Sequence, residues 1–345
     1  MVGALKTARV TLNGMLATRI LLFLLVGAAG LFLLVKIAQE GPSFFVQILV
    51  FGIANGAIYA LIALGYTMVY GIIELINFAH GDVFTLGAFI SLPLISAFGL
   101  TEGRSAGVGM VLALLAIFTI VMLCTGMVNV AIERVAYRPL RDAPRLAPLI
   151  TAVGMSFVLE GAMFLWRGPY NIHYPDLLPG NRISVGGGAS VGFKDLFVIV
   201  SAVVLVIGLS LFVNRSRLGK AMRATAQDRD AALLMGININ GTIAATFFIG
   251  AVIAGAGGII FGLYFNNVNA FLGFSAGLAA FTAAVFGGIG NIEGAALGGL
   301  FIGLVRTFND GYFSSAWSDV LIFAILILVL VFRPTGLLGM RVREK

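Results

Sequence analysis

Three polar side chains interrupt an apolar stretch in the first third of the chain. Within INFAHGDVFTLGAF, residues 76–89, they are Asn77, His80 and Asp82. An imidazole and a carboxylate can exchange protons or bind a charged ligand, and polar groups inside a membrane indicate a pathway or an internal network because they are costly there. We predict that these three residues line a translocation path. In the alternative, Asn77 or Asp82 caps a helix at a break near Gly81, and His80 bonds a neighbouring carbonyl.

A second polar stretch, RATAQDRDAALLMGI at residues 223–237, separates two long apolar blocks. Acidic residues suit the start of a helix, where the dipole is positive, and glycine is common just past a helix end. We therefore predict a short helix beneath the membrane. Its small apolar surface without aromatic residues favours docking into a protein groove over resting on lipid headgroups. The candidate docking residues are Asp230, Ala231, Ala232, Leu233, Leu234 and Gly236.

Residues for catalysis are scarce. The chain has two histidines, His80 and His173, and one cysteine, Cys124. It contains no HExxH zinc motif, no GxxxxGK[ST] phosphate loop and no Cys/His spacing typical of a metal site. We predict that the protein is not an enzyme and carries no catalytic residue, metal or cofactor of its own.

The composition predicts an all-α, polytopic transmembrane helical bundle. Of 345 residues, 60% are hydrophobic and only 11% are charged, less than half the charged share of ordinary soluble domains. About eight stretches are long enough to cross a hydrocarbon core of ~30 Å, and a Gly-rich hairpin at 274–309 adds two shorter segments that meet near 290–293. The expected spans are 20–38, 44–73, 76–98, 107–131, 147–166, 194–213, 242–264 and 318–332. The first belongs to an N-terminal extension, 1–43, and could instead be a signal peptide; we predict that it is retained ahead of a permease domain at 44–345.

Basic residues gather in four segments that this span count puts on one side of the membrane. They are the N-terminus, the loop after the fourth span, residues 214–241 and the C-terminal tail, and together they hold most of the 22 Lys and Arg. The positive-inside rule makes that side the cytoplasm. We therefore predict a protein of the bacterial plasma membrane with both termini cytoplasmic, 214–241 as an inner loop and 167–193 as an outer loop. The net charge of +7 then reflects membrane orientation, so no nucleic-acid partner is expected.

Small residues recur every fourth position in several spans and predict close helix packing. These ladders are Gly52-Gly56-Ala60, Gly250-Ala254-Gly258-Gly262, Gly294-Gly298 and Gly299-Gly303. Two further carboxylates have structural interpretations. Glu160 is expected to reach outward or to pair with Arg167, and Glu293 to be solvated or to cap a helix near the cytoplasmic side.

Several motifs resemble one family of transport proteins. Asp230-Ala231-Ala232, followed after three residues by Gly236, is similar to the Glu-Ala-Ala…Gly signature of ABC importer permeases, with Asp in place of Glu. NFAHGDVFTLGAF, MRATAQDRDAALLMGIN, AFTAAVFGGIGNIEGAALGG and RPTGLLG together resemble the LivH-type permease subunit of the branched-chain amino acid transporters. The resemblance covers about residues 45–340. Glu293 stands where many relatives have proline.

The resemblance implies a set of partners. These are a second homologous permease subunit, two cytoplasmic ATP-binding subunits, an extracytoplasmic substrate-binding protein and the lipid bilayer. The helix ending at Gly236 would then couple to an ATP-binding subunit, and the cargo would be branched-chain amino acids. Two other functions stay open: an importer permease for urea or short amides, and an ion-coupled secondary transporter in which Asp82 or Glu160 is the coupling carboxylate.

Overall fold

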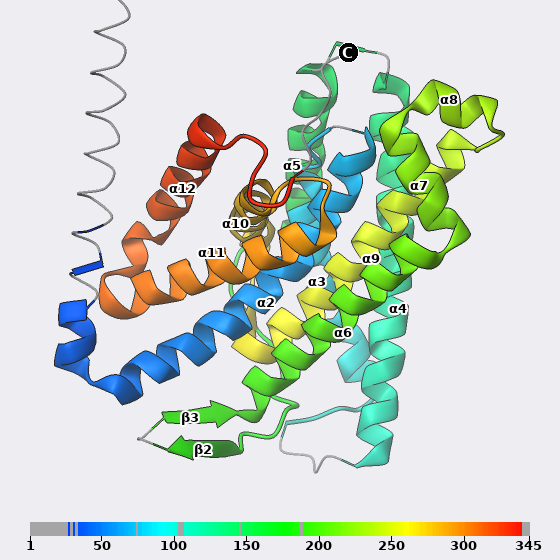
Figure 1. Ribbon diagram of the computed structural model, residues 1–345. Helices are drawn as coiled ribbons and strands as arrows, with labels where there is room; N and C mark the ends of the chain where they lie inside the picture. The colour runs from blue at the N-terminus through cyan, green and yellow to red at the C-terminus, as the bar shows by residue number, and fades with distance from the viewer. Residues whose placement is uncertain are drawn as a thin grey trace, which may run out of the picture.

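The computed structural model describes residues 27, 30–31, 34–73, 75–102, 107–141, 143–144, 146–186 and 189–339. The predicted first span, 20–38, lies largely outside these residues, as do the basic residues of the two termini up to Arg19 and from Arg341. Over the described part the chain is a bundle of helices (Figure 1). Its long helices are α2 (Pro42–Ile73), α3 (Ala79–Ala97), α4 (Val108–Ile132), α5 (Leu146–Arg167), α6 (Phe193–Arg215), α9 (Ile239–Phe265), α11 (Ile292–Tyr312) and α12 (Ser318–Phe332).

Seven stretches among the described residues are long and apolar enough to cross a membrane. They correspond to the seven predicted spans after the first, so the prediction of a polytopic helical bundle is confirmed. The fourth predicted span runs on past α4 through a π-helical turn, η1 (Glu133–Tyr137), and a 3₁₀ turn, η2 (Arg138–Leu140). α3 begins at Ala79 rather than at residue 76, because residues 75–78 are not helical.

The Gly-rich hairpin is formed by α10 (Leu272–Gly287) and α11. α10 has 16 residues and is therefore about 24 Å long, shorter than the hydrocarbon core. The turn lies where the sequence predicted it. Gly288 and Gly290 adopt positive φ, and the Asn291 side chain accepts a hydrogen bond from the Gly294 amide at 3.0 Å, which caps α11. Glu293 is exposed in the first turn of α11, as predicted for a solvated carboxylate.

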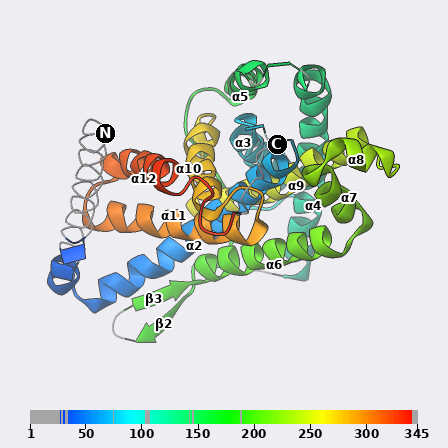
Figure 2. The ribbon, with the colours of Figure 1, turned by 45° about the horizontal axis from the view of Figure 1, so that its top comes forward.

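The central helices are more buried than the peripheral ones. α2, α3 and α9 are mostly buried, whereas most residues of α4, α5, α6 and α12 are partly or fully exposed. In Figure 2, α3 and α9 lie between α4, α5 and α6. A helix that is apolar all round and buried is a core helix, and an exposed apolar face is expected toward lipid.

The glycine ladders form backbone-to-backbone contacts between helices. A Cβ placed on Gly303 of α11 would lie 2.2 Å from the Cα of Gly56 in α2, and one on Gly299 would lie 2.3 Å from the Cα of Ala60. A Cβ on Gly258 of α9 would lie 2.1 Å from the Phe84 carbonyl oxygen of α3. The predicted close packing is confirmed, since only glycine fits at these three positions.

Two short antiparallel sheets, which the sequence analysis did not anticipate, lie at the opposite end of the bundle from residues 217–234. β1 (Ile172–His173) pairs with β4 (Asn267–Val268). β2 (Arg182–Gly186) pairs with β3 (Ala189–Gly192) and forms the hairpin at the bottom of Figure 1. Both fall within or beside the predicted outer loop, so this loop is partly ordered by sheet pairing.

Candidate coupling surface and buried polar core

The polar stretch at 223–237 contains the end of one helix and all of another. α7 (Arg217–Gln227) ends before Asp228, and α8 (Arg229–Leu234) follows at once. The Asp228 carboxylate starts α8 because it accepts hydrogen bonds from the amides of Asp230 and Ala231, both at 3.0 Å. An aspartate in this role is a strong N-cap.

Glycine ends α8 as predicted. Gly236 has φ +80°, its amide bonds the Leu233 carbonyl at 2.9 Å, and the Ile237 amide bonds the Ala232 carbonyl at 3.0 Å. This pair of bonds is the Schellman motif, which requires a residue that tolerates the left-handed conformation. The sequence therefore predicted the end of α8 correctly.

Apolar side chains of α8 project away from the bundle. Ala232 is buried, whereas Leu233, Leu234 and Met235 are 61%, 88% and 82% exposed. α8 lies at the upper right of Figure 1, at the same end as the connection between α4 and α5. That end also carries basic residues: Arg134, Arg138, Arg141, Arg217, Lys220, Arg223 and Arg229. Exposed leucines on a short helix among cations form a surface that a protein partner can cover. We call Leu233, Leu234 and Met235 the α8 surface.

Arginine side chains link α8 and the start of α9 to the rest of the bundle. Arg229, the first residue of α8, donates to the carbonyl of Ile72 near the end of α2 at 3.3 Å. Arg141 donates to the Asn240 side chain at the start of α9 at 2.5 Å. The short segment that holds the α8 surface is thus fastened at both ends to elements of the membrane bundle.

A fully buried carboxylate, Glu133, lies at the centre of this end of the bundle. It accepts hydrogen bonds from Arg138, at 3.1 Å and 3.3 Å, and from Arg141. Partial burial lowers the pKa of the Arg141 guanidinium, and the charge of Glu133 opposes that shift. The sequence analysis missed Glu133, because Arg138 follows it by five residues, a spacing that a regular α-helix puts on different faces, and Arg141 follows by eight, about 12 Å further along a regular helix. The π-helical and 3₁₀ turns bring them together.

The same π-helical turn contacts the break between α2 and α3. Tyr137, its last residue, donates a hydrogen bond to the Asn77 side-chain oxygen at 2.8 Å. Asn77 does not cap α3, and neither does Asp82, because no side chain caps the α3 N-terminus. The prediction that Asn77 or Asp82 caps a helix near Gly81 is therefore wrong. Asn77 binds the neighbouring α4–α5 connection instead.

His80 and Asp82 are both completely buried. The His80 ring lies edge-on to Tyr66, with ring centroids 5.0 Å apart. The Asp82 carboxylate accepts a hydrogen bond from Ser156 of α5 and lies close enough to Glu160 for their charges to interact. Among the described residues, one oxygen of Asp82 lacks a hydrogen-bond partner.

Glu160 therefore has a different neighbour from the one expected. It is buried and lies close enough to Asp82 for their charges to interact, and no ion pair joins it to Arg167 in the described part of the chain. Arg167 instead lies over the ring of Trp166, at 5.2 Å from the ring centroid. The sequence carried a signal for this cluster, since Ser156 and Glu160 are four residues apart and share a helix face, but nothing in the sequence pointed to Asp82 as the partner.

At the opposite end of the bundle, several polar contacts surround Tyr174. Its hydroxyl bonds Ser91 of α3 at 2.7 Å, and its amide bonds the Asn266 carbonyl at 3.0 Å. Burial raises the pKa of Tyr174. Lys194 adds an ion pair with Asp176 at 2.8 Å. These contacts fix the base of the predicted outer loop to α3, α6 and α9.

Comparison with known proteins places the chain among membrane permeases. The profile of the family described as branched-chain amino acid transport system, permease component, matches residues 48–330. The chain belongs to this family. It is 45% identical over 307 residues to the high-affinity branched-chain amino acid transport system permease protein BraD of Pseudomonas aeruginosa, an alignment that covers 87% of this chain and 98% of the relative.

Two further relatives are less similar to the chain. LivH of Escherichia coli K12, a high-affinity branched-chain amino acid transport system permease protein, is 41% identical over 305 residues, which cover 88% of this chain and 98% of LivH. The autoinducer 2 import system permease protein LsrC of Klebsiella pneumoniae is 28% identical over 194 residues, 54% of this chain and 55% of LsrC. No solved structure matches the chain significantly. This permease is thus an integral protein of the inner membrane.

Proposed function

We propose that this permease imports branched-chain amino acids as one subunit of an ATP-driven complex. The partners are a second similar permease, two ATP-binding subunits and an external substrate-binding protein. Family membership and the similarity to BraD and LivH, both branched-chain amino acid permease proteins, support this cargo. The chain itself contains no phosphate-binding loop, so nucleotide binding belongs to partner chains.

The α8 surface is the proposed docking site for an ATP-binding subunit. Leu233, Leu234 and Met235 enter a groove on that subunit, while Asp230, Ala231, Ala232 and Gly236 keep α8 short and rigid. Exposed apolar side chains at the end of a short helix form a patch that a partner protein can cover. The basic residues of the α4–α5 connection and of α7 and α8 support a cytoplasmic location for this end, with the β2–β3 hairpin facing the substrate-binding protein.

Two sets of hydrogen bonds then transmit a movement of α8 to the buried polar core. One is the Arg229 bond to the end of α2. The other runs from Asn240 through Arg141 and Glu133 to the π-helical turn, and from Tyr137 of that turn to Asn77. Both routes end at the break between α2 and α3. We propose that shifts of this break rearrange Asn77, His80 and Asp82 and open the path shared with the second permease. π-Helical turns are frequent at functional sites, which agrees with this assignment.

Co-purification of the assembled complex tests the docking site. Leu234→Asp adds a charge to the α8 surface, and Gly236→Pro removes the amide that ends α8. Both are expected to release the ATP-binding subunits. Leu146→Asp is the matched control, because Leu146 is also exposed, at the start of α5, but lies outside α8. If the ATP-binding subunits stay bound to both α8 variants, the docking assignment is wrong.

ATP hydrolysis by the complex in proteoliposomes tests the cargo. With the substrate-binding protein present, leucine, isoleucine and valine are expected to stimulate hydrolysis, whereas urea and short amides are not. The buried pair Asp82 and Glu160 is the feature that favours an ion-coupled transporter instead. Uptake into ATP-free vesicles driven by an ion gradient would support that alternative and exclude ATP-driven import.

A further inference from the structure

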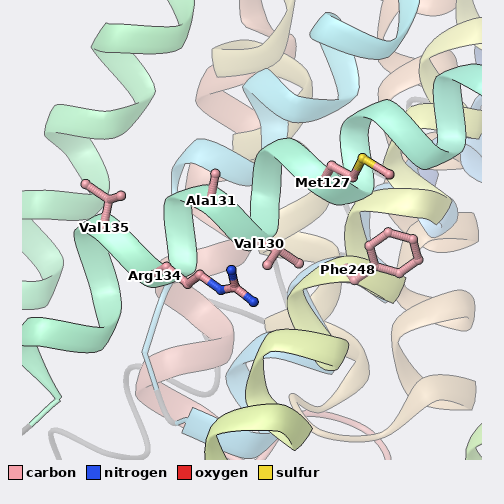
Figure 3. A pocket seen from close by; sticks show the side chains of 6 residues that line it. All are labelled: Met127, Val130, Ala131, Arg134, Val135 and Phe248. Carbon is pink, nitrogen blue, oxygen red and sulfur yellow. The ribbon is translucent and has the colours of Figure 1, made fainter.

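A groove opens on the side of the bundle between α4 and α9 (Figure 3). Its volume is about 470 Å³, and it is lined by Met127, Val130, Ala131, Arg134, Val135 and Phe248. Five of the six lining residues are apolar. The Phe248 ring of α9 forms one wall and fits against α4 at Gly126, where a Cβ would lie only 2.5 Å from the ring.

Arg134 is the charged residue of this groove. Its guanidinium extends along the groove beside Val130, on the side that faces Phe248 (Figure 3). Arg134 forms no hydrogen bond or ion pair with any described residue. Glu133, its neighbour in sequence, is completely buried and already paired with Arg138 and Arg141. A free guanidinium is therefore available to an anion from outside the chain.

The depth of Arg134 matches that of a lipid headgroup. Arg134 follows Val108, the first residue of α4, by 26 positions, which corresponds to about 39 Å of helix at 1.5 Å per residue. The hydrocarbon core is about 30 Å thick, and the bilayer with its headgroups about 40–45 Å. With Val108 at one boundary, Arg134 lies among the headgroups of the opposite leaflet. The apolar part of the groove then runs inward from Arg134 to Met127, about two helical turns.

The surroundings favour lipid over another helix. Exposed positions on α4 carry large apolar side chains, including Leu115, Leu123 and Met127. Helix–helix contacts in membranes use small residues, and this chain follows that rule where Gly303 meets Gly56. The groove also lies at the end of the bundle where arginines outnumber described carboxylates, which attracts negative charge.

We propose that this groove is a binding site for an anionic phospholipid. The phosphate binds the Arg134 guanidinium, with which it can form a charge-assisted, two-pronged hydrogen bond. The upper part of one acyl chain lies along Val130, Met127 and Phe248. The site is independent of the transported substrate and fixes the α4 end, which bears the Glu133 network, to its membrane leaflet.

Native mass spectrometry of the assembled transporter, extracted from nanodiscs of mixed phosphatidylglycerol and phosphatidylcholine, tests this site. Arg134→Gln is expected to lower retained phosphatidylglycerol about fivefold, as for the loss of one basic residue at a lipid surface, and to leave phosphatidylcholine unchanged. Ala131→Trp fills the groove while keeping the charge, so it is expected to lower retention of both lipids. Arg134→Lys is expected to keep most of the phosphatidylglycerol and serves as the conservative variant.

Arg217→Gln is the matched control, since Arg217 is exposed at the same end of the bundle but lies outside the groove. If Arg134→Gln and Arg217→Gln lowered retained phosphatidylglycerol equally, general surface charge would explain the effect. This outcome would overturn the proposal. If lipid were retained by the isolated permease but not by the assembled complex, the second permease would cover the groove. This outcome would also overturn the proposal.

Discussion

The crossing of α2 with α11 and the end of the bundle around Glu133 are held together by different chemistry. At the crossing, Gly303 and Gly299 bring backbone against backbone, so the two helices have little room to shift. Around Glu133, long arginine side chains join elements of the bundle: Arg141 links the α4–α5 connection to α9, and Arg229 links α8 to α2. Long side chains can follow a movement without losing their bonds. The comparison suggests a rigid glycine-packed scaffold that supports an adjustable polar linkage.

The largest expected effect is at the scaffold. Gly303→Leu forces a side chain into a space where even a Cβ would lie 2.2 Å from the Gly56 Cα, so we expect a loss of stability of at least about 3 kcal/mol and little folded protein. Gly208→Leu in α6 is the control, because nothing lies within 4 Å of a Cβ at that position. Thermal unfolding in detergent measures both. Equal stability of the two variants would contradict the rigid crossing.

Removal of the Glu133 carboxylate should have the next largest effect. Glu133→Ala leaves Arg138 and Arg141 without their buried partner. Because these side chains are 38% and 14% exposed, we expect a cost below the ~3–5 kcal/mol typical of a fully buried pair. Glu133→Gln keeps two hydrogen-bonding atoms and should retain more folded protein while transporting less substrate per ATP. Glu293→Ala, at an exposed carboxylate of α11, should change neither measurement greatly. If Glu133→Gln transported as much substrate per ATP as the wild type, Glu133 would not belong to the coupling route.

Arg229→Ala tests the adjustable linkage more gently. The variant loses one hydrogen bond to Ile72 and keeps the α8 surface, so the ATP-binding subunits should remain bound. With about 1 kcal/mol of coupling lost, we expect uptake per ATP hydrolysed to fall roughly fivefold. Arg217→Ala on α7 is the control. Parallel assays of uptake and ATP hydrolysis in proteoliposomes distinguish this result from a loss of assembly.

The smallest effect is expected at Glu102, which contacts His173 and Asp176 of the predicted outer loop. Hydrogen bonds from His173, at 2.5 Å, and from the Asp176 amide lower the pKa of Glu102. A carboxyl whose pKa is lowered by folding stabilises the protein above its unfolded pKa of about 4.3, and this contribution disappears as pH falls through the folded value. Wild type and Glu102→Gln should therefore differ slightly in melting temperature at pH 7 and converge near pH 3. A constant difference across this range would contradict the assignment.

Sequence reasoning predicted the scaffold better than the linkage. Four-residue spacing of glycines is a local pattern, and so are the start and stop of α8 at Asp228 and Gly236. Long apolar runs likewise set seven of the spans. The contacts of Glu133 and Asn77 depend on which helices become neighbours and on the π-helical turn, and no local pattern carries that information. Glu160 illustrates the same limit, because Arg167 is its neighbour in the sequence, whereas Asp82 on α3 comes near it only in the fold.

The most direct test of the coupling account is cross-linking from single cysteines in the assembled complex. In a Cys124→Ala background, Leu234→Cys places a thiol on the α8 surface, and Ile183→Cys places one on the exposed β2 strand at the opposite end. The account predicts that a thiol cross-linker joins position 234, and not position 183, to an ATP-binding subunit. A cross-link to that subunit from position 183, with none from position 234, would contradict it.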